Sequence, residues 1–300
     1  MDQVSPATMI DAATERAVIE ATCWGTRGSI ASPGPDTVGF GGNTPCLEVR
    51  VRDGRRFIFD AGTGIRPLGE SMMAAGGTRD AVVFFTHFHW DHIQGFPFFR
   101  PLYDPEASLR IIGPDQARAD IERLFAKQMA SINFPVPFTA LSADMEFSNL
   151  DGGDWEEHGF CVHSMRLRHP SFTVGHRIEY GGISLAYLPD NELANESYEV
   201  GKEWRKRLVD FLGDCDVLIH DAMFTQEEYG SKVDWGHSTF TQTLELAHEV
   251  GAKKLLFFHH DPLRSDQELT EIVDRHKSEA AARGYSVEIG AAAERDAIIR

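Results

Sequence analysis

Residues 86–92 read THFHWDH and directly follow the apolar run AVVFF at residues 81–85. His87 and His89 are two residues apart, so in an extended or turning backbone both imidazoles can reach one cation, while Asp91 and His92 can turn toward a second. Imidazole and carboxylate ligands without thiolate suit zinc, manganese or iron. Four unrelated polar residues in a loop are the alternative. The segment therefore predicts a paired metal site, which is a common means of hydrolysing phosphodiesters.

Other apolar runs end in the same way. Each is short enough for a strand and is followed at once by a metal-type or acid/base side chain. Strand ends that meet at one edge of a sheet would bring these side chains into one cleft. A hydrogen-bonded structural histidine is the alternative for any one of them taken alone. The residues are Asp60, His169, Asp190, His220, Asp221 and His259, after the runs at 56–59, 162–167, 184–188, 216–219 and 254–258.

Helical patterns alternate with these runs. Residues 115–129 carry an apolar stripe, residues 238–250 open with Ser238 as a cap, and the pair Ser265 and Glu268 forms a capping box for a helix that stops before Gly284. Strands interleaved with helices predict an α/β (α+β) fold in which helices cover the sheets.

The chain has 300 residues, and no linker or internal repeat divides it. We therefore expect one domain over residues 1–300, with residues 1–20 as an N-terminal extension. The four cysteines lack CxxC spacing, so they are read as buried thiols and not as zinc ligands or disulfides. No apolar run approaches the roughly 20 residues of a membrane-spanning helix, and the first residues lack the pattern of a signal peptide. The expected location is the cytoplasm, with no membrane contact.

The formal net charge is −17. Affinity for long polynucleotides comes mainly from Lys and Arg contacts with phosphates, so an acidic surface disfavours an extended nucleic acid as substrate. A small-molecule substrate is the expectation, and the sequence leaves a homodimer open.

The segment HFHWDH resembles the HxHxDH signature of the metallo-β-lactamase superfamily, and the resemblance continues in order along the chain through FIFDAGTG, LRHP, YLPDNE and FFHHDP. It implies a four-layer αββα sandwich with the site at one edge of its two sheets. Asp60 would support the metal loop. The final ligand is open between His259 and His260, with His259 preferred because it stands three residues before a proline. The implied ligands are His87, His89 and His169 on one metal ion, Asp91, His92 and His259 on the other, and Asp190 between them.

Two further segments resemble the branch that contains ribonuclease Z and related phosphodiesterases. HDAMF at 220–224 and WGHST at 235–239 match its HEAT and HST pair, with Asp221 in place of the usual Glu. A histidine held by a carboxylate can donate a proton to a departing alkoxide, which would be the role of His237. The alternative is that Ser238 caps a helix and His237 packs nearby.

The resemblance also has a gap. No Gly/Pro/basic arm of the kind that clamps tRNA in ribonuclease Z is apparent. Residues 115–147 are instead read as a lid over a small pocket, with Phe134, Pro135, Pro137 and Phe138 as its wall, or as a segment that packs on the core.

Together these features predict a metal-dependent phosphodiesterase that cleaves a small or cyclic phosphodiester. The resemblance implies two divalent ions per chain, zinc ahead of manganese or iron, with a hydroxide held between them. The alternatives are a tRNA 3′-end endonuclease, a lactone or β-lactam hydrolase, and a non-hydrolytic metal-binding sensor. The residues expected in catalysis are His237, Asp221 and Asp91, with Asp60, His220 and His260 around the ligands.

Overall fold

The computed structural model describes residues 19–114, 120–150 and 153–299, and two seven-stranded sheets organise it. In spatial order, the first sheet contains β14 (Ala297–Ile299), β1 (Ile19–Gly25), β2 (Cys46–Val51), β3 (Arg56–Phe59), β4 (Ala81–Phe84), β5 (Ser108–Pro114) and β6 (Asp144–Leu150). The second contains, in the same sense, β13 (Glu288–Ala291), β12 (Lys254–Phe258), β11 (Val217–Asp221), β10 (Ile183–Leu188), β9 (Val174–Tyr180), β8 (Phe160–Arg166) and β7 (Asp154–Glu157).

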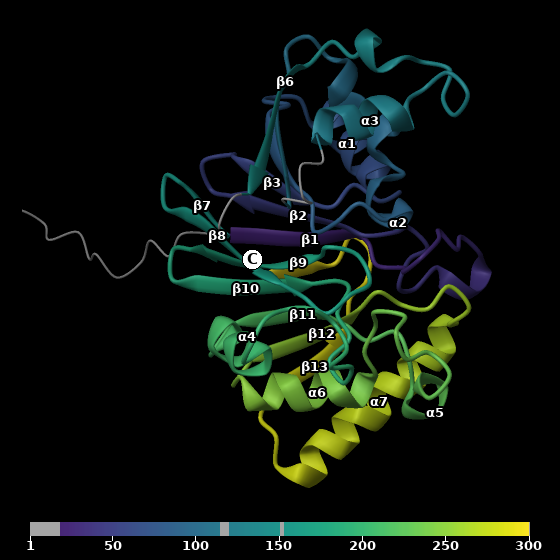
Figure 1. Cartoon of the computed structure of the whole chain (residues 1–300), viewed down its shortest axis with the longest axis vertical. Coiled ribbons are helices and arrows are strands. Elements are labelled where there is room, and N and C mark those ends of the chain that lie inside the picture. The colour runs from purple at the N-terminus through teal and green to yellow at the C-terminus, as the bar shows by residue number, and fades with distance from the viewer. Residues whose placement is uncertain (1–18, 115–119, 151–152, 300) are drawn as a thin grey trace, which may run out of the picture.

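Helices cover the outer faces of both sheets (Figure 1). The inner faces bury a shared core that includes Phe57, Phe84, Ile178 and Tyr187. Because two sheets packed on one core carry helices on both outsides, the architecture is the four-layer αββα sandwich, and that expectation is confirmed. The first sheet carries α1 (Ile65–Ala75) and α3 (Ile121–Gln128), the second carries α4 (Trp204–Leu212), α6 (Phe240–Glu249) and α7 (Asp266–Arg283), and α2 (Trp90–Ile93) and α5 (Gln226–Tyr229) are single turns.

Strand direction determines where the site forms. Strands β3 to β6 pair in parallel in the first sheet, and β10 to β13 pair in parallel in the second. Parallel neighbours end at the same edge, so the residues that follow β3, β4, β10, β11 and β12 are brought to the same side of the sandwich. The polar residues after the apolar runs therefore gather there, as the sequence predicts.

Apolar runs at residues 22–24, 46–51 and 109–112 also predict strands, and they lie in β1, β2 and β5. Five strands have no such run: β6, β7, β9, β13 and β14. Strand β6 illustrates the reason, since its residues alternate between exposed and half-buried and it pairs at the edge of its sheet. An edge strand covered on one side needs few apolar residues, so its composition resembles that of a loop.

Two helix starts differ from the prediction. Helix α3 begins at Ile121, where the Asp120 side chain accepts a hydrogen bond from the Arg123 amide, and residues 115–119 of the predicted helix lie outside the described residues. Helix α6 is capped by Thr239 and not by Ser238. The Ser238 hydroxyl instead donates to the Asn191 carbonyl and accepts from the Leu193 amide at 3.1 Å. Because these bonds with the loop after β10 occupy the hydroxyl, it does not cap the helix.

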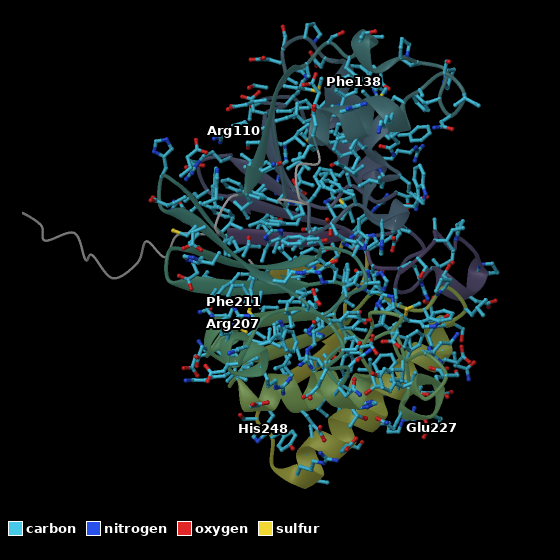
Figure 2. The ribbon with its side chains drawn as sticks, in the orientation of Figure 1. Arg110, Phe138, Arg207, Phe211, Glu227 and His248 are labelled. Atoms are coloured by element: carbon cyan, nitrogen blue, oxygen red, sulfur yellow. The ribbon has the colours of Figure 1, made fainter. Side chains whose placement is uncertain are left out.

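The structure also gives different bounds for the predicted N-terminal extension, residues 1–20, and for the predicted lid, residues 115–147. Ile19 and Glu20 belong to β1, so they are not part of an N-terminal extension, and residues 1–18 lie outside the described residues. In the predicted lid, residues 144–147 form the start of β6. Phe138 lies beside α3 on the outer face of the first sheet and contacts Phe147 with ring centroids 6.1 Å apart, so this end of the segment packs on the sheet (Figure 2).

Within the described part of the chain, no helix combines the length and apolar character needed to cross a bilayer. All four cysteines are unpaired thiols. Three of them are buried as expected, whereas Cys161 on β8 is half-buried.

The capping box at the start of α7 gives a stability prediction. The Ser265 hydroxyl accepts from the Glu268 amide and the Glu268 carboxylate accepts from the Ser265 amide, so Ser265→Ala should lower the free energy of unfolding by about 1 kcal/mol. Ser278→Ala on the same helix is the matched control, because its exposed hydroxyl bonds only a carbonyl within the helix. Equal losses in urea unfolding would contradict the capping role.

Candidate active site

The loop after β4 is held by the carboxylate of Asp60. Asp60 follows β3 with a φ of 63° and accepts hydrogen bonds from the Thr86 amide at 2.8 Å and from the Tyr187 hydroxyl at 3.1 Å. Nδ1 of His92 donates to the same carboxylate at 2.8 Å. A second-layer carboxylate of this kind fixes the tautomer of a metal-binding histidine, because it leaves Nε2 free to bind. The predicted supporting position of Asp60 therefore has a physical basis.

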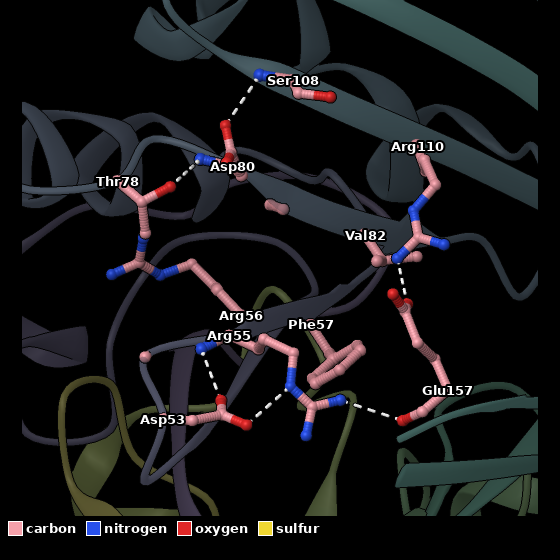
Figure 3. A pocket seen from close by; sticks show the side chains of 12 residues that line it. Asp53, Arg55, Arg56, Phe57, Thr78, Asp80, Val82, Ser108, Arg110 and Glu157 are labelled. Atoms are coloured by element: carbon pink, nitrogen blue, oxygen red, sulfur yellow. Dashed lines mark hydrogen bonds and ion pairs between the residues drawn. The ribbon is translucent and has the colours of Figure 1, made fainter. Parts of the chain in front are cut away.

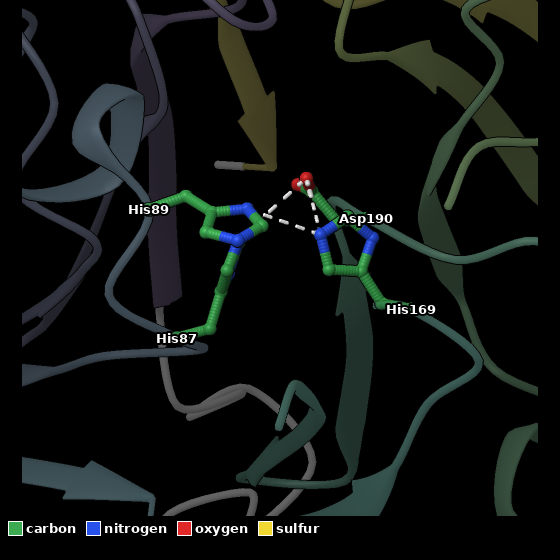
Figure 4. Close-up of side chains that lie close together, drawn as sticks. All are labelled: His87, His89, His169 and Asp190. Atoms are coloured by element: carbon green, nitrogen blue, oxygen red, sulfur yellow. Dashed lines mark hydrogen bonds and ion pairs between the residues drawn. The ribbon is translucent and has the colours of Figure 1, made fainter. Parts of the chain in front are cut away.

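Three histidines and one aspartate form a first group of ligand atoms that lie within 4.8 Å of one another (Figure 4). His87 and His89 come from the loop after β4, His169 from the loop after β8, and Asp190 from the loop after β10. Nε2 of His169 lies 3.1 Å from Nδ1 of His89, and Nε2 of His87 lies 3.7 Å from Oδ2 of Asp190. His89 is exposed while the other three are buried, so the group opens to solvent at His89.

Asp91, His92 and His259 form a second group with the same spacing. Nε2 of His259 lies 3.1 Å from Oδ2 of Asp91 and 3.4 Å from Oδ1 of Asp190. Nε2 of His92 lies 3.0 Å from the same oxygen of Asp190. Asp190 thus contacts both groups, one with each carboxylate oxygen, which is the position expected of a carboxylate between two metal ions.

Two other predicted histidines lie outside both groups. Nε2 of His260 donates to the Ala292 carbonyl at 2.9 Å, and its ring packs edge-on against Phe40. Nδ1 of His220 donates to the Asp221 carbonyl at 2.7 Å, and its Nε2 lies 3.0 Å from the Asn191 amide nitrogen. His259, and not its neighbour His260, therefore points into the cluster.

The cluster suits divalent metal ions. Nε2 of His87 and Oδ1 of Asp190 are buried and have no hydrogen-bond partner among the described residues. Burial lowers the pKa of His87 well below its usual value and that of His169 to about 3, so both imidazoles are neutral. Burial would raise the pKa of Asp190, but the surrounding imidazoles hold it well below its usual value, so the carboxylate is ionised. Neutral imidazole and ionised carboxylate are the forms that bind metal.

His237 and Asp221, predicted as a pair from segments 16 residues apart, are in direct contact. Nδ1 of His237 lies 2.7 Å from Oδ2 of Asp221, and both side chains are buried. Burial opposes the charged imidazolium, but the Asp221 carboxylate raises the pKa of His237 to about 9. The His237 ring stacks on His259 with centroids 4.7 Å apart, and a ligand atom of His237 lies within 4.8 Å of those of His259 and Asp190. The pair therefore adjoins the second group.

Sequence reasoning missed the glycines on which two of these imidazoles rest. A Cβ atom on Gly28 would lie 2.3 Å from the His259 ring. A Cβ atom on Gly236 would lie 2.0 Å from Nδ1 of His169, whose proton goes to the Gly236 carbonyl at 3.1 Å. Each glycine is required because an imidazole occupies the place of its side chain. The signal in the sequence for Gly236 was its position inside the motif WGHST, and Gly28 lies in the segment GTRGS at residues 25–29.

Glu192 is a second feature that sequence reasoning missed. It is fully buried, and its carboxylate accepts from the hydroxyls of Tyr198 and Tyr229, both at 2.7 Å, and from the amides of Asp234 and Gly236 at 3.1 and 2.9 Å. A carboxylate with this many donors holds the loop that leads to His237 in one conformation. Glu192 follows Asp190 by two residues, so the same short segment positions both the metal cluster and the adjoining His237.

Two histidine–carboxylate groups that share one aspartate, set at the edge of an αββα sandwich, are typical of metal-dependent hydrolases. A family model supports this class over most of the chain. Residues 55–260 match the beta-lactamase superfamily domain, so the chain belongs to the beta-lactamase superfamily and is a metal-dependent hydrolase.

Several known proteins are similar to this chain. Ribonuclease Z from Bacillus mycoides (strain KBAB4) is 25% identical over 264 residues, which cover 71% of this chain and 80% of the relative. The structure of a diphosphatase from the PhnP family aligns with a TM-score of 0.64 and 18% identity over 94% of this chain and 98% of that one. The short form of human tRNase Z aligns with a TM-score of 0.62 and 18% identity over 93% and 98%. The structural matches establish the shared fold.

The contact between Gly236 and His169 gives a prediction on metal binding. Gly236→Ala should lower the bound metal per chain, because the new methyl group collides with His169. Gly182→Ala is the matched control, since Gly182 has a φ of +79°, close to the +88° of Gly236, but no atom within 4 Å of an added Cβ. Both variants should lose about 1 kcal/mol of stability from backbone strain. Metal analysis after reconstitution checks the difference, and equal metal content would contradict it.

Proposed function

We propose that this protein is a phosphodiesterase that hydrolyses a small or cyclic phosphodiester. The observation that carries the proposal is the His237–Asp221 pair, bonded at 2.7 Å and stacked against His259 of the cluster. Nδ1 of His237 is engaged by Asp221, so Nε2 is the atom available to a substrate. A proton donor beside a metal cluster suits a reaction with a poor leaving group such as a ribose alkoxide.

The residues that would hold the two metal ions are those of the two groups, with Asp190 common to both. When bound, divalent ions would supply Lewis acidity to the phosphoryl oxygens and lower the pKa of a water molecule. Asp221 orients the His237 ring, and Nε2 of His237 would deliver the proton to the leaving oxygen. Glu192 holds the loop that carries His237, which limits the motion of that donor. Asp91 accepts from the Ser29 amide at 2.8 Å, so its orientation is fixed as well.

A tRNA 3′-end endonuclease is the second candidate, and the similarity to ribonuclease Z favours it. The formal net charge of −17 opposes it, because binding of a long polynucleotide depends on Lys and Arg contacts. A lactone or β-lactam hydrolase has less support, because those branches of the superfamily generally lack the paired HDA and GHST segments that this chain has at residues 220–222 and 236–239. A non-hydrolytic sensor has less support still, because every side chain of the predicted ligand set lies in the cluster.

Substrate size distinguishes the first two candidates. At physiological salt, the metal-reconstituted protein should hydrolyse cyclic nucleotides and other small diesters faster than it removes a 3′ trailer from precursor tRNA, because the acidic surface repels the polynucleotide. A hydrolysis panel with both substrates and a lactone measures this. Site-specific trailer removal without activity on small diesters would assign the endonuclease function instead.

The role of His237 gives a prediction that separates proton donation from metal binding. His237→Ala should reduce kcat by about 10²- to 10⁴-fold on a substrate that releases a ribose alkoxide, while the metal content stays unchanged. A substrate that releases p-nitrophenolate needs little protonation, so the variant should cleave it nearly as well as the wild type. Asp221→Asn should show the same pattern with a smaller loss. Equal losses on both substrates, or a loss of metal, would assign His237 to the metal ligands or to a structural role.

A further inference from the structure

A groove of about 640 Å³ runs between the metal-binding loop and helix α3. The volume is in the range of small-molecule sites. One wall comes from the turn that carries His89 and Asp91, and the other from α3. The lining residues are Phe88, Trp90, Ile93, Asp120, Arg123, Leu124, Lys127, Gln128 and Asn133.

Trp90 lines the groove and is adjacent in sequence to two residues of the cluster. It stands between His89 and Asp91 in the sequence, begins the short helix α2, and has 64% of its surface exposed. His89, the exposed member of the first ligand group, is its neighbour. An indole left open to solvent at this position offers a flat face for stacking directly beside the cluster.

The opposite wall presents two cations, Arg123 and Lys127, one helical turn apart on α3. Neither forms an ion pair with another residue of the described ranges. The one carboxylate in the lining, Asp120, accepts the Arg123 backbone amide as the cap of α3. Arg123 and Lys127 are therefore suited to an anionic group of a ligand.

A second cavity, of about 390 Å³, shows the contrast (Figure 3). It is also lined by arginines, but Arg55 pairs with Asp53, Arg56 with Glu48, and Arg110 with Glu157. Each of these three arginines therefore already has a carboxylate partner within the protein.

From these features we infer that the groove is a subsite for one nucleotide unit of the substrate. The base stacks on Trp90, and a phosphate that is not cleaved pairs with Arg123 and Lys127. This assignment rests on the proposed phosphodiesterase function and narrows its substrate to nucleotide phosphodiesters. A flat ring and an anion within one small groove are the chemistry of a nucleotide, and a sugar phosphate without a base provides only the anion.

Equilibrium binding to the metal-loaded protein tests the subsite without requiring turnover. In calorimetry AMP should bind about tenfold tighter than ribose 5-phosphate, and Trp90→Ala should remove most of this difference while Trp90→Phe keeps it. Arg123→Ala combined with Lys127→Ala should weaken AMP binding and reduce its salt dependence. The matched control is Arg275→Ala combined with Lys277→Ala, which removes the same charge from α7 on the other side of the sandwich and should leave AMP binding unchanged (Figure 1).

Kinetics with two substrates that release the same leaving group show which hypothesis is wrong if a prediction fails, the nucleotide subsite or the phosphodiesterase function. Thymidine 5′-(p-nitrophenyl phosphate) and methyl p-nitrophenyl phosphate release the same phenolate and differ in the nucleoside. The ratio of their kcat/KM values should fall about tenfold in Trp90→Ala. An unchanged ratio together with unchanged AMP binding overturns the subsite and leaves the phosphodiesterase function standing. Hydrolysis of neither diester, with AMP binding that depends on Trp90, overturns the phosphodiesterase function and supports the nucleotide subsite.

Discussion

The carboxylate of Asp60 is the constraint on which the rest of the site depends. It lies at the end of β3 in a left-handed conformation, and it ties together the loop after β4, the imidazole of His92 and the hydroxyl of Tyr187 from the second sheet. These contacts link both sheets to the metal-binding loop through one fully buried group. A buried carboxylate is stable only when it is well hydrogen-bonded, so the requirement for partners is also what gives the loop a single conformation.

Close packing constrains the other ligands in a similar way. His259 and His169 each rest on a glycine, and Glu192 holds the loop that presents Gly236 and His237. Elements distant in sequence therefore determine each other's positions: the loop near Gly28 supports His259, and the loop near Gly236 supports His169. The positions of the metal ligands therefore depend on the residues packed against them, such as Gly28, Gly236 and Glu192, as well as on the strands that precede them.

The proposed substrate depends on a contrast between the whole surface and one groove. The net charge of −17 disfavours long polynucleotides, yet Arg123 and Lys127 lie without carboxylate partners among the described residues, across from an exposed Trp90. Local charge decides which small anions are retained, while the overall field decides which macromolecules approach. A small nucleotide substrate is consistent with both.

The sequence by itself determined the class of fold and the cluster of site residues, because buried strands have a distinctive apolar composition and His-rich motifs after strand ends have few other uses. It also predicted the helix that starts at Ser265, whose capping box is entirely local. Only the tertiary structure decided between His259 and His260, since both follow β12 and only contacts with Asp91 and Asp190 distinguish them. The structure also shows that Thr239, and not Ser238, caps α6, because the Ser238 hydroxyl is hydrogen-bonded to the loop after β10. Edge strands such as β6 were beyond sequence reasoning for the same reason, because pairing partners come from segments whose distance in space the local pattern does not encode. The sequence offered residues 115–147 as a lid over a small pocket, but only the structure showed that the groove there is lined by α3 and Trp90 and not by the predicted wall residues Phe134, Pro135, Pro137 and Phe138.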